Sequence, residues 1–291
     1  MNTDLNHYRD AANTVEWHGH RIRFWRQVSP GKPWLLLVHG FPSASWDWHG
    51  LWPQLSQHFC LLAVDMLGFG LSDKPADHHY SLLEQADLLT DVLQLQDISN
   101  CHVLAHDYGN SVVQEMLYRQ QQGELDTRLL SICWLNGGLF AESHRPLVAQ
   151  RLLKSPLGPL FVRLMGKGAF SRSLKRIFGP DTAPESSAVD VLWWLLGYQQ
   201  GRRVLPRLLH YLDERRMYRD RWVRAMQHTD ILLGFINGHH DPISGEHMLQ
   251  RFQTLLPEAY TARLAVGHYP QIEAPQQVLS AYQGFVSDIM S

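Results

Sequence analysis

The chain has 291 residues, of which 45% are hydrophobic and 19% are charged, with a formal net charge of −2. This balance gives no reason to expect nucleic acid or an anionic membrane as a partner, and the length suits one large α/β domain with an insertion. The polar N-terminus lacks the apolar region of a secretory signal, and the longest apolar stretches are too short to span a bilayer. We therefore expect a cytoplasmic protein without a membrane span.

The three cysteines and 17 histidines suggest neither disulfides nor a metal site. Cys60, Cys101 and Cys133 each lie in an apolar, strand-like run, and their number is odd, which favours reduced thiols in the core. The histidines show neither the H-E-x-x-H pattern nor zinc spacing with cysteine. We expect no metal and no organic cofactor.

Short apolar runs alternate with helical patterns along the chain. The segment 14–28 alternates around a turn and predicts a β-hairpin. Continuous apolar runs predict strands buried on both faces, and helical leucine spacing predicts the helices between them. The predicted strands span 34–40, 59–65, 101–106, 129–138, 230–241 and 259–268; the predicted helices span 81–96, 110–121, 245–256 and 275–289. This order predicts a mostly parallel, doubly wound sheet of the α/β class.

The alternation stops between residues 139 and 222. This segment contains several helical patterns separated by Pro and Gly, and no further strand. We interpret it as a helical cap inserted before the later strands, with a core formed by 1–138 and 223–291. Loops at the carboxyl ends of parallel strands build most ligand sites, so a cap inserted there would cover the site.

Three chemically active residues each follow a predicted strand. Asp107 lies in a strand-to-helix turn, Asp241 follows the fifth buried strand, and His268 follows the sixth. Nucleophile, acid and histidine in that chain order are typical of α/β-hydrolases. Taken alone, Asp107 could be a helix N-cap and Asp241 a turn residue before Pro242. The shared order and position favour a catalytic triad.

The chain resembles the α/β-hydrolase superfamily over nearly its whole length, in the branch of epoxide hydrolases and haloalkane dehalogenases. In the usual G-x-S-x-G elbow, this sequence carries Asp107 instead of serine. It resembles the mesoderm-specific transcript proteins, an epoxide-hydrolase-like group, more closely and through the predicted cap. The motifs are HGFP (39–42), DMLGFGLSDKP (65–75), AHDYG (105–109), NGHHDP (237–242) and GHYP (267–270), and for the closer group HDYGNSVVQEMLYR (106–119), LNGGLFAESHRPL (135–147), FSRSLKRIFGP (170–180) and GHYPQIEAP (267–275).

An aspartate at the elbow suits attack on a saturated carbon. A carboxylate is ionised at neutral pH and needs no base to activate it, and the start of a helix favours its charge. Asp107 would form an alkyl ester, and His268, oriented by Asp241, would activate the water that hydrolyses it. Backbone N–H groups of Phe41 and Tyr108 would hold the oxyanion. We expect His106, beside the nucleophile, to be a hydrogen-bonding group and not a catalyst.

The resemblance leaves the leaving group open. Dehalogenases carry a Trp after the nucleophile and often Asn or Glu in the HG-x-P loop, whereas this chain has Tyr108 and Phe41. Trp46 and Trp48 remain as candidate donors to a halide, although buried aromatics more often serve packing. These differences favour epoxides over haloalkanes as substrates.

Epoxide hydrolases commonly use two cap tyrosines as the acid that protonates the opening ring. The candidates here are Tyr198, Tyr211 and Tyr218. Of the two cap tyrosines of epoxide hydrolases, Tyr211 lies nearest to the one that comes later in the chain, but it is about one residue out of register. The cap tyrosine that comes earlier in the chain has no counterpart in this sequence. The resemblance therefore supports an epoxide substrate only in part.

We expect a hydrolase acting on a small apolar substrate, most favourably an epoxide. Three alternatives remain open: a haloalkane dehalogenase, an esterase or lactonase, and a non-enzymatic protein that binds an apolar ligand under its cap. Glu142 and Asp230 are weaker candidates than Asp241 for the acid of the triad. The sequence does not indicate the oligomeric state.

Overall fold

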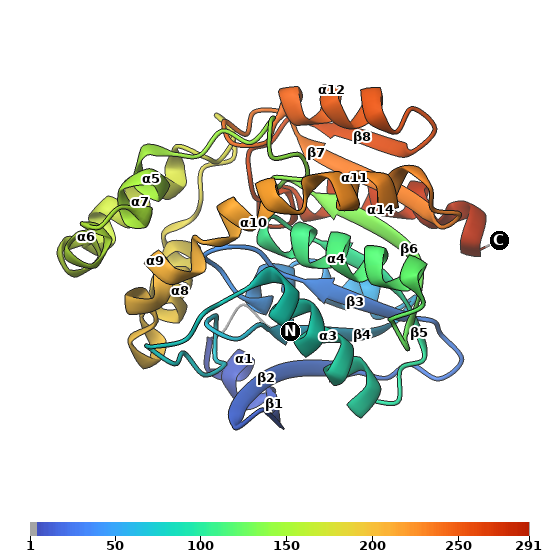
Figure 1. Cartoon of the computed structure of the whole chain (residues 1–291), viewed down its shortest axis with the longest axis horizontal. Helices are drawn as coiled ribbons and strands as arrows, with labels where there is room; N and C mark the ends of the chain where they lie inside the picture. The colour runs from blue at the N-terminus through green and yellow to red at the C-terminus, as the bar shows by residue number, and fades with distance from the viewer. Residues whose placement is uncertain (1–4, 291) are drawn as a thin grey trace.

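The computed structural model describes residues 5–290. Its centre is an eight-stranded sheet with helices on both faces (Figure 1). The strands run in the order β1-β2-β4-β3-β5-β6-β7-β8 across the sheet. Their bounds are β1 Asn13–Trp17, β2 His20–Gln27, β3 Trp34–Val38, β4 Cys60–Asp65, β5 Asn100–Ala105, β6 Arg128–Leu135, β7 Leu232–Gly238 and β8 Tyr260–Leu264.

The first two strands form the predicted antiparallel hairpin, and β2 also pairs antiparallel with β4. All the other neighbours pair in parallel. The apolar runs of β3 to β7 are almost fully buried, because helices cover both faces of those strands. β8 is only partly buried, because it lies at the edge of the sheet. The predicted α/β class with a mostly parallel sheet is confirmed.

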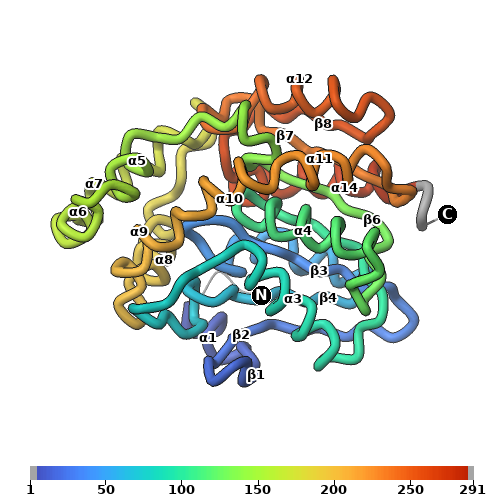
Figure 2. The backbone as a smooth tube through the Cα atoms, viewed as in Figure 1, coloured from blue at the N-terminus to red at the C-terminus, as the bar shows by residue number. Residues whose placement is uncertain are grey.

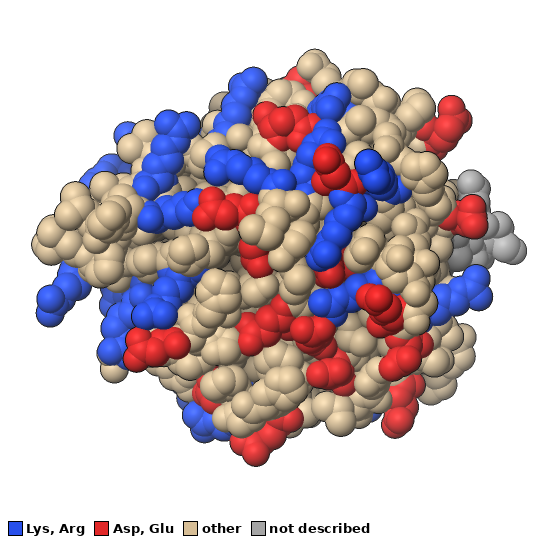
Figure 3. All heavy atoms as spheres, in the orientation of Figure 1, with Lys and Arg blue, Asp and Glu red and all other residues tan. Residues whose placement is uncertain are grey.

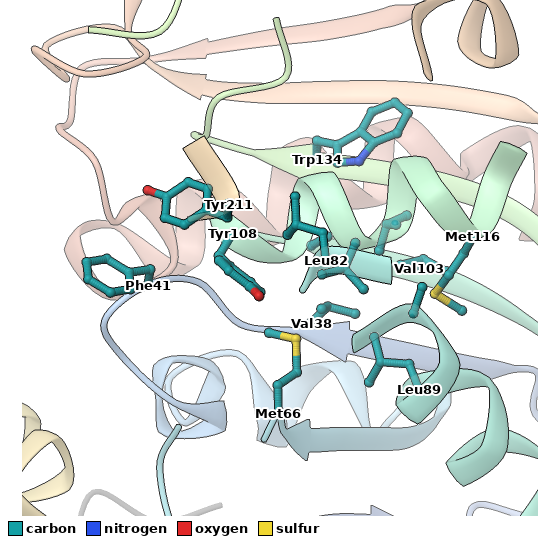
Figure 4. Close-up of a cluster of buried hydrophobic side chains, with 14 of the residues drawn as sticks. Val38, Phe41, Met66, Leu82, Leu89, Val103, Tyr108, Met116, Trp134 and Tyr211 are labelled. Atoms are coloured by element: carbon teal, nitrogen blue, oxygen red, sulfur yellow. The ribbon is translucent and has the colours of Figure 1, made fainter. Parts of the chain in front are cut away.

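Two hydrophobic clusters lie on opposite faces of the sheet. One includes side chains of α3, α4, α11 and α12, and Figure 4 shows part of it around Val103 and Leu82. The other includes side chains of α2 and α14. The helices of these two layers are α2 Trp52–Leu55, α3 Leu82–Leu95, α4 Tyr108–Gln122, α11 Arg219–Gln227, α12 Glu246–Leu255 and α14 Pro275–Met290. Hydrophobic burial on both faces therefore fixes the sheet whose carboxyl edge carries the site.

Most of the predicted insert forms a separate group of short helices between β6 and β7 (Figures 1 and 2). These helices extend from the carboxyl edge of the sheet to one side of the molecule. α11 packs instead on α4, so the predicted cap boundary at residue 222 falls inside a helix of the core layer. The insert contains α5 Val148–Lys154, α6 Gly158–Leu164, α7 Lys167–Lys175, α8 Ser186–Gly197, the 3₁₀-helix η2 Tyr198–Val204, α9 Leu205–Leu208 and α10 Tyr211–Met217.

Short helices near the loops account for the elements that the sequence patterns missed. They are α1 Leu5–Asp10, the 3₁₀-helix η1 Ser45–Trp48, α2 and α13 Pro270–Glu273. With four to six residues each, they are too short to show an amphipathic period. η1 and α13 contact each other beside the carboxyl edge of the sheet, where they support the loops that carry the site.

Candidate active site

Asp107 occupies a strained turn between β5 and α4. Its φ of 44° and ψ of −102° are unusual for a residue with a side chain, and such strain persists only where the surroundings impose it. The backbone N–H of Asp107 donates to the carbonyl of Asn136 at 2.9 Å. A Cβ atom on Gly109 would lie 2.6 Å from the carbonyl oxygen of His39, so only glycine lets α4 start this close to β3. The fold therefore holds Asp107 at the sharp bend that the elbow motif predicts.

The Asp107 carboxylate is buried and has two polar neighbours. The Phe41 N–H donates to Oδ2 at 3.1 Å. The buried Arg215 guanidinium, from α10, lies 3.5 Å from Oδ1 and donates to the Asp107 carbonyl at 2.8 Å. Burial alone would raise the pKa of Asp107, but Arg215 and then His268 outweigh it and hold this pKa below its ordinary value. The carboxyl group is thus kept ionised, as a nucleophile needs to be.

His268 and Asp241 form a buried pair at the same edge of the sheet. His268 Nδ1 lies 2.8 Å from Asp241 Oδ2. The Asn136 amide, the Ser244 hydroxyl and the Ile243 N–H also donate to the Asp241 carboxylate, at 3.0, 2.6 and 2.7 Å. These donors fix the carboxylate, which in turn fixes the orientation of the histidine ring.

The pKa values of the pair move in opposite directions. Burial opposes the charge of Asp241, but His268 and the hydrogen-bond donors lower its pKa to about 2. Burial also opposes the charge of His268, but Asp241 and then Asp107 raise the pKa of its ring to about 9. At neutral pH the free protein therefore holds two carboxylates around a protonated imidazole, with Arg215 as the second cation.

A largely apolar cavity of about 310 Å³ extends from His268 into the insert. His268, Phe41 and Tyr269 line its inner end, and side chains of α5 to α9 line most of the rest. The lining includes Leu153, Phe161, Met165, Phe170 and Leu174. A cavity with this lining suits an apolar ligand and brings it to the reactive edge of the sheet.

Tyr211 is the predicted cap tyrosine that lies at the site. Its ring is fully buried between those of Phe41, at 6.0 Å, and Tyr108, at 5.1 Å (Figure 4). The Gln150 amide, which lines the cavity, lies 3.4 Å from the Tyr211 hydroxyl. Burial and then Asp107 raise the pKa of Tyr211, so its hydroxyl stays protonated and can donate.

The other four tentative leaving-group residues do not line the cavity, and Tyr211 contacts it only through the lining residues Phe41 and Gln150. Tyr198 packs against Trp194 with Lys74 over its ring, and Tyr218 lies against Arg221 and Trp222. Trp48 is fully buried, and Trp46 stacks on His49 beside a different cavity. All four side chains belong to packing layers, which is the usual role of large aromatic residues.

Two groups near Asp107 were not expected from the sequence. Arg215 also donates to the Ser111 hydroxyl at 2.7 Å, and its Nη1 has no partner among the described residues. His144 lies close by: a Cβ on Gly138 would be 2.4 Å from Arg215 Nη1 and 2.8 Å from His144 Nδ1. Arg215 belongs to the charged run LDERR (212–216), in which no pattern separates a buried arginine from exposed ones.

His106 and the weaker acid Glu142 have other partners. His106 Nε2 lies 2.8 Å from the carbonyl oxygen of His268, and burial, with His268, lowers the pKa of His106 to about 3. A neutral His106 therefore helps to position the loop of His268. Glu142 forms exposed ion pairs with Arg219 and Arg251. Among the side chains described in residues 5–287, no three His, Cys, Asp or Glu are grouped as metal ligands would be.

Comparisons with known proteins identify the family of this chain. The model of the alpha/beta hydrolase family matches residues 35–281. The human mesoderm-specific transcript homolog protein is 38% identical over 296 residues, covering 97% of this chain and 88% of that protein. These matches confirm the resemblance drawn from the motifs. The chain therefore shares both the family pattern and most of its length with such relatives.

Solved structures show the same fold at low sequence identity. Haloalkane dehalogenase DbeA from Bradyrhizobium elkani superposes with a TM-score of 0.78 at 17% identity, covering 96% of this chain and 98% of that one. Epoxide hydrolase CorEH superposes with a TM-score of 0.75 at 17% identity, covering 96% and 99%. With the family match and the full-length relative, these findings establish that the chain belongs to the α/β-hydrolase family.

Proposed function

We propose that this protein is a hydrolase that opens epoxides through an alkyl ester on Asp107. The observation that carries the proposal is the buried, ionised carboxylate of Asp107 in a strained elbow, held by the N–H of Phe41, which lines an apolar cavity together with His268. In this position a serine would attack acyl groups, whereas a carboxylate suits displacement at a saturated carbon. α5 to α10 form the cap of this enzyme.

In the first step, Asp107 Oδ1 attacks an epoxide carbon and the C–O bond of the ring breaks. Oδ2 stays on the Phe41 N–H and becomes the carbonyl oxygen of the ester. The epoxide oxygen takes the electron pair and a proton from the Tyr211 hydroxyl. A proton held by His268 in the free enzyme then restores Tyr211 through water, which leaves His268 neutral.

In the second step, neutral His268 takes a proton from water as that water attacks the carbonyl carbon of Asp107. Once Asp107 is esterified, its negative charge no longer raises the pKa of His268, so more of the ring is neutral at neutral pH and able to accept a proton than in the free enzyme. The Phe41 N–H donates a hydrogen bond to the oxyanion. We assign the Tyr108 N–H as the second donor to that oxyanion. Collapse releases the diol, whose alkoxide takes the proton of the new carboxyl group.

Arg215 acts as a positioning residue in this scheme. It fixes the Asp107 backbone through the carbonyl and opposes the effect of burial on the carboxylate. Because a guanidinium remains charged throughout, it also favours the return of Asp107 to a carboxylate in the second step.

A mass-spectrometric trap tests the proposal. His268→Gln is exposed to a panel of epoxides, and the peptide that carries Asp107 is expected to gain the mass of one substrate. The active protein, turned over in H₂¹⁸O, is expected to incorporate ¹⁸O into Asp107. Absence of both the adduct and the label across the panel would contradict the ester mechanism.

The same trap separates the alternatives. Halide release with an adduct from bromo- and chloroalkanes would indicate a dehalogenase, although Trp46 and Trp48 lie away from the cavity. Ester turnover abolished by Asp107→Asn would indicate an esterase. Tight retention of an apolar ligand that His268→Ala leaves unchanged would indicate a binding protein. The buried free thiols of Cys60, Cys101 and Cys133 support the cytoplasm as the compartment in which the enzyme works.

A further inference from the structure

The near-neutral net charge conceals a strongly basic segment in the cap. Residues 143–180 contain eight of the chain's 26 Lys and Arg residues and none of its 28 Asp and Glu residues, so this segment carries +8 and the remainder −10. Six of the eight form no ion pair in the described part of the chain, and these six are exposed. They are Arg145, Arg151, Arg163, Arg172, Lys175 and Arg176.

The same segment exposes an unusual amount of apolar surface. Four of the eight large hydrophobic side chains that are exposed in residues 5–287 lie between residues 148 and 164. Leu157, Leu160 and Leu164 occur at helical spacing, so they share one side of α6, and they are 61%, 55% and 76% exposed. We name these three residues the leucine face. Val148, at the start of α5, is 78% exposed.

The two properties occur together at one end of the molecule. Figure 3 shows Lys and Arg side chains around an uncharged surface at the left, where α5 to α7 lie in Figure 1. The other side of α6 faces inward, since Phe161 and Met165 line the cavity that reaches His268. α6 is thus apolar both toward the cavity and toward solvent.

We propose that the leucine face and the surrounding basic side chains dock on an anionic lipid bilayer surface. Apolar side chains within a ring of cations fit a membrane interface, where the leucines enter the boundary of the acyl chains and the cations meet lipid phosphates. A positive segment on an otherwise negative protein also orients the molecule with its cap toward such a surface. The docked cap would place the outer end of the cavity against the lipid, so that apolar molecules dissolved there reach His268.

This inference goes beyond the proposed chemistry and does not depend on it. It adds no membrane-spanning element, and in the described chain no helix combines the length and apolar character needed to cross a bilayer. A basic protein-binding patch would not need three neighbouring exposed leucines, and a second copy of this chain would bring a second positive cap into contact with the first. Charge complementarity therefore favours anionic lipid over either protein partner.

Vesicle flotation tests the docking surface directly. The full-length protein is expected to bind vesicles of phosphatidylcholine with phosphatidylglycerol, to bind pure phosphatidylcholine vesicles at least about 10-fold more weakly, and to lose binding as salt is raised. Leu160→Ser/Leu164→Ser and Arg151→Glu/Arg163→Glu are each expected to weaken binding about 10-fold. The matched controls Leu95→Ser and Arg128→Glu change exposed residues at the amino edge of the sheet and are expected to bind normally.

A labelling measurement covers the case in which a variant is poorly folded. The native cysteines are buried, so Leu160→Cys can be labelled selectively with an environment-sensitive dye. Its emission is expected to shift to shorter wavelength with phosphatidylglycerol vesicles, whereas dye on Leu95→Cys is not. No binding to anionic vesicles, equal binding by the face variants and the controls, or a dimer in solution that Leu160→Ser/Leu164→Ser dissociates would each overturn the proposal.

Discussion

The carboxyl edge of the sheet and the outer end of the cap follow opposite physical rules. At the sheet edge, Asp107, Asp241 and His268 are almost fully buried, and several donors hold the carboxylates. In the outer cap, helices of seven to nine residues leave leucines and arginines in solvent. The first region holds its groups at fixed distances and charges, and we propose that the second makes contact with a lipid surface.

The difference shows how such an enzyme can separate chemistry from substrate access. Preorganised charges at a rigid sheet edge suit a reaction whose steps depend on angles and pKa values. Short helices with few buried contacts are among the least stable parts of a fold, which suits an entrance that must open. Changes at the sheet edge should therefore alter the reaction, whereas changes in the outer cap should alter only delivery.

The largest expected effect is that of Asp107→Asn. An amide keeps the shape of the carboxylate but is a very poor nucleophile, so turnover of any epoxide substrate is expected to fall by about 10⁴-fold or more. The measurement is diol formation in freshly prepared protein, because slow deamidation would restore Asp107. Leu164→Ser in the outer cap is the matched control and is expected to turn over a small water-soluble epoxide at the normal rate. Undiminished turnover by Asp107→Asn would show that the reaction does not depend on the sheet edge, and the contrast with the outer cap would fail.

A smaller effect is expected for Tyr211→Phe. Loss of the hydroxyl removes the acid that protonates the opening ring, and general acids contribute about 10²-fold to 10⁴-fold. Epoxide turnover is expected to fall by about 10²-fold with little change in stability, since the ring still packs between Phe41 and Tyr108. Tyr198→Phe and Tyr218→Phe, whose rings pack against Trp194 and Trp222, are controls for which normal rates are expected. Equal losses in all three variants would mean that the acid is not Tyr211.

The sheet edge was also the region that the sequence described best. The strands have long apolar runs, and the residues that follow them in parallel strands must meet at one edge, so the neighbourhood of Asp107, Asp241 and His268 followed from their order alone. The hairpin of β1 and β2 was equally predictable, because the alternation of polar and apolar residues and the turn between them both indicate the same pair of strands. Such elements are predictable because local pattern and tertiary contact favour the same structure.

Side chains that reach the site from the insert were much less predictable. Arg215 and Tyr211 lie on the same short helix as exposed charged residues, and burial selects them only after α10 packs beside α4. The exposed leucine face had the opposite difficulty, because its apolar spacing is indistinguishable in sequence from that of a helix that packs inward. Net charge conceals the basic segment in the same way, since a sum over the chain removes the contrast between its regions.

Arg215→Gln tests how strongly the cap helix α10 acts on the nucleophile. Arg215 lowers the pKa of Asp107, so its removal raises this pKa, and the acid limb of the profile of kcat/KM against pH is expected to move to higher pH. At neutral pH we expect a fall of about 10-fold to 100-fold, which Arg215→Lys partly restores by keeping the charge. Arg219→Gln, whose pairing with Glu142 is exposed, is the control for which no shift is expected. An unmoved acid limb would show that Arg215 only fills space.

The smallest expected effect is on stability, in the comparison of the wild type with His268→Gln across pH. Because the folded pKa of His268 is raised from 6.5 to about 9, the protonated ring stabilises the fold fully below about pH 6.5, and this contribution is lost as pH rises through 9. The wild type should therefore melt roughly 3 °C or more above His268→Gln at pH 6, with the gap closing by pH 9. Leu164→Ser should show no such pH-dependent gap, since no titratable group depends on it. A constant gap for His268→Gln would mean that the imidazole stabilises by packing and not by its charge between two carboxylates, and the electrostatic contrast between the sheet edge and the outer cap would then be lost.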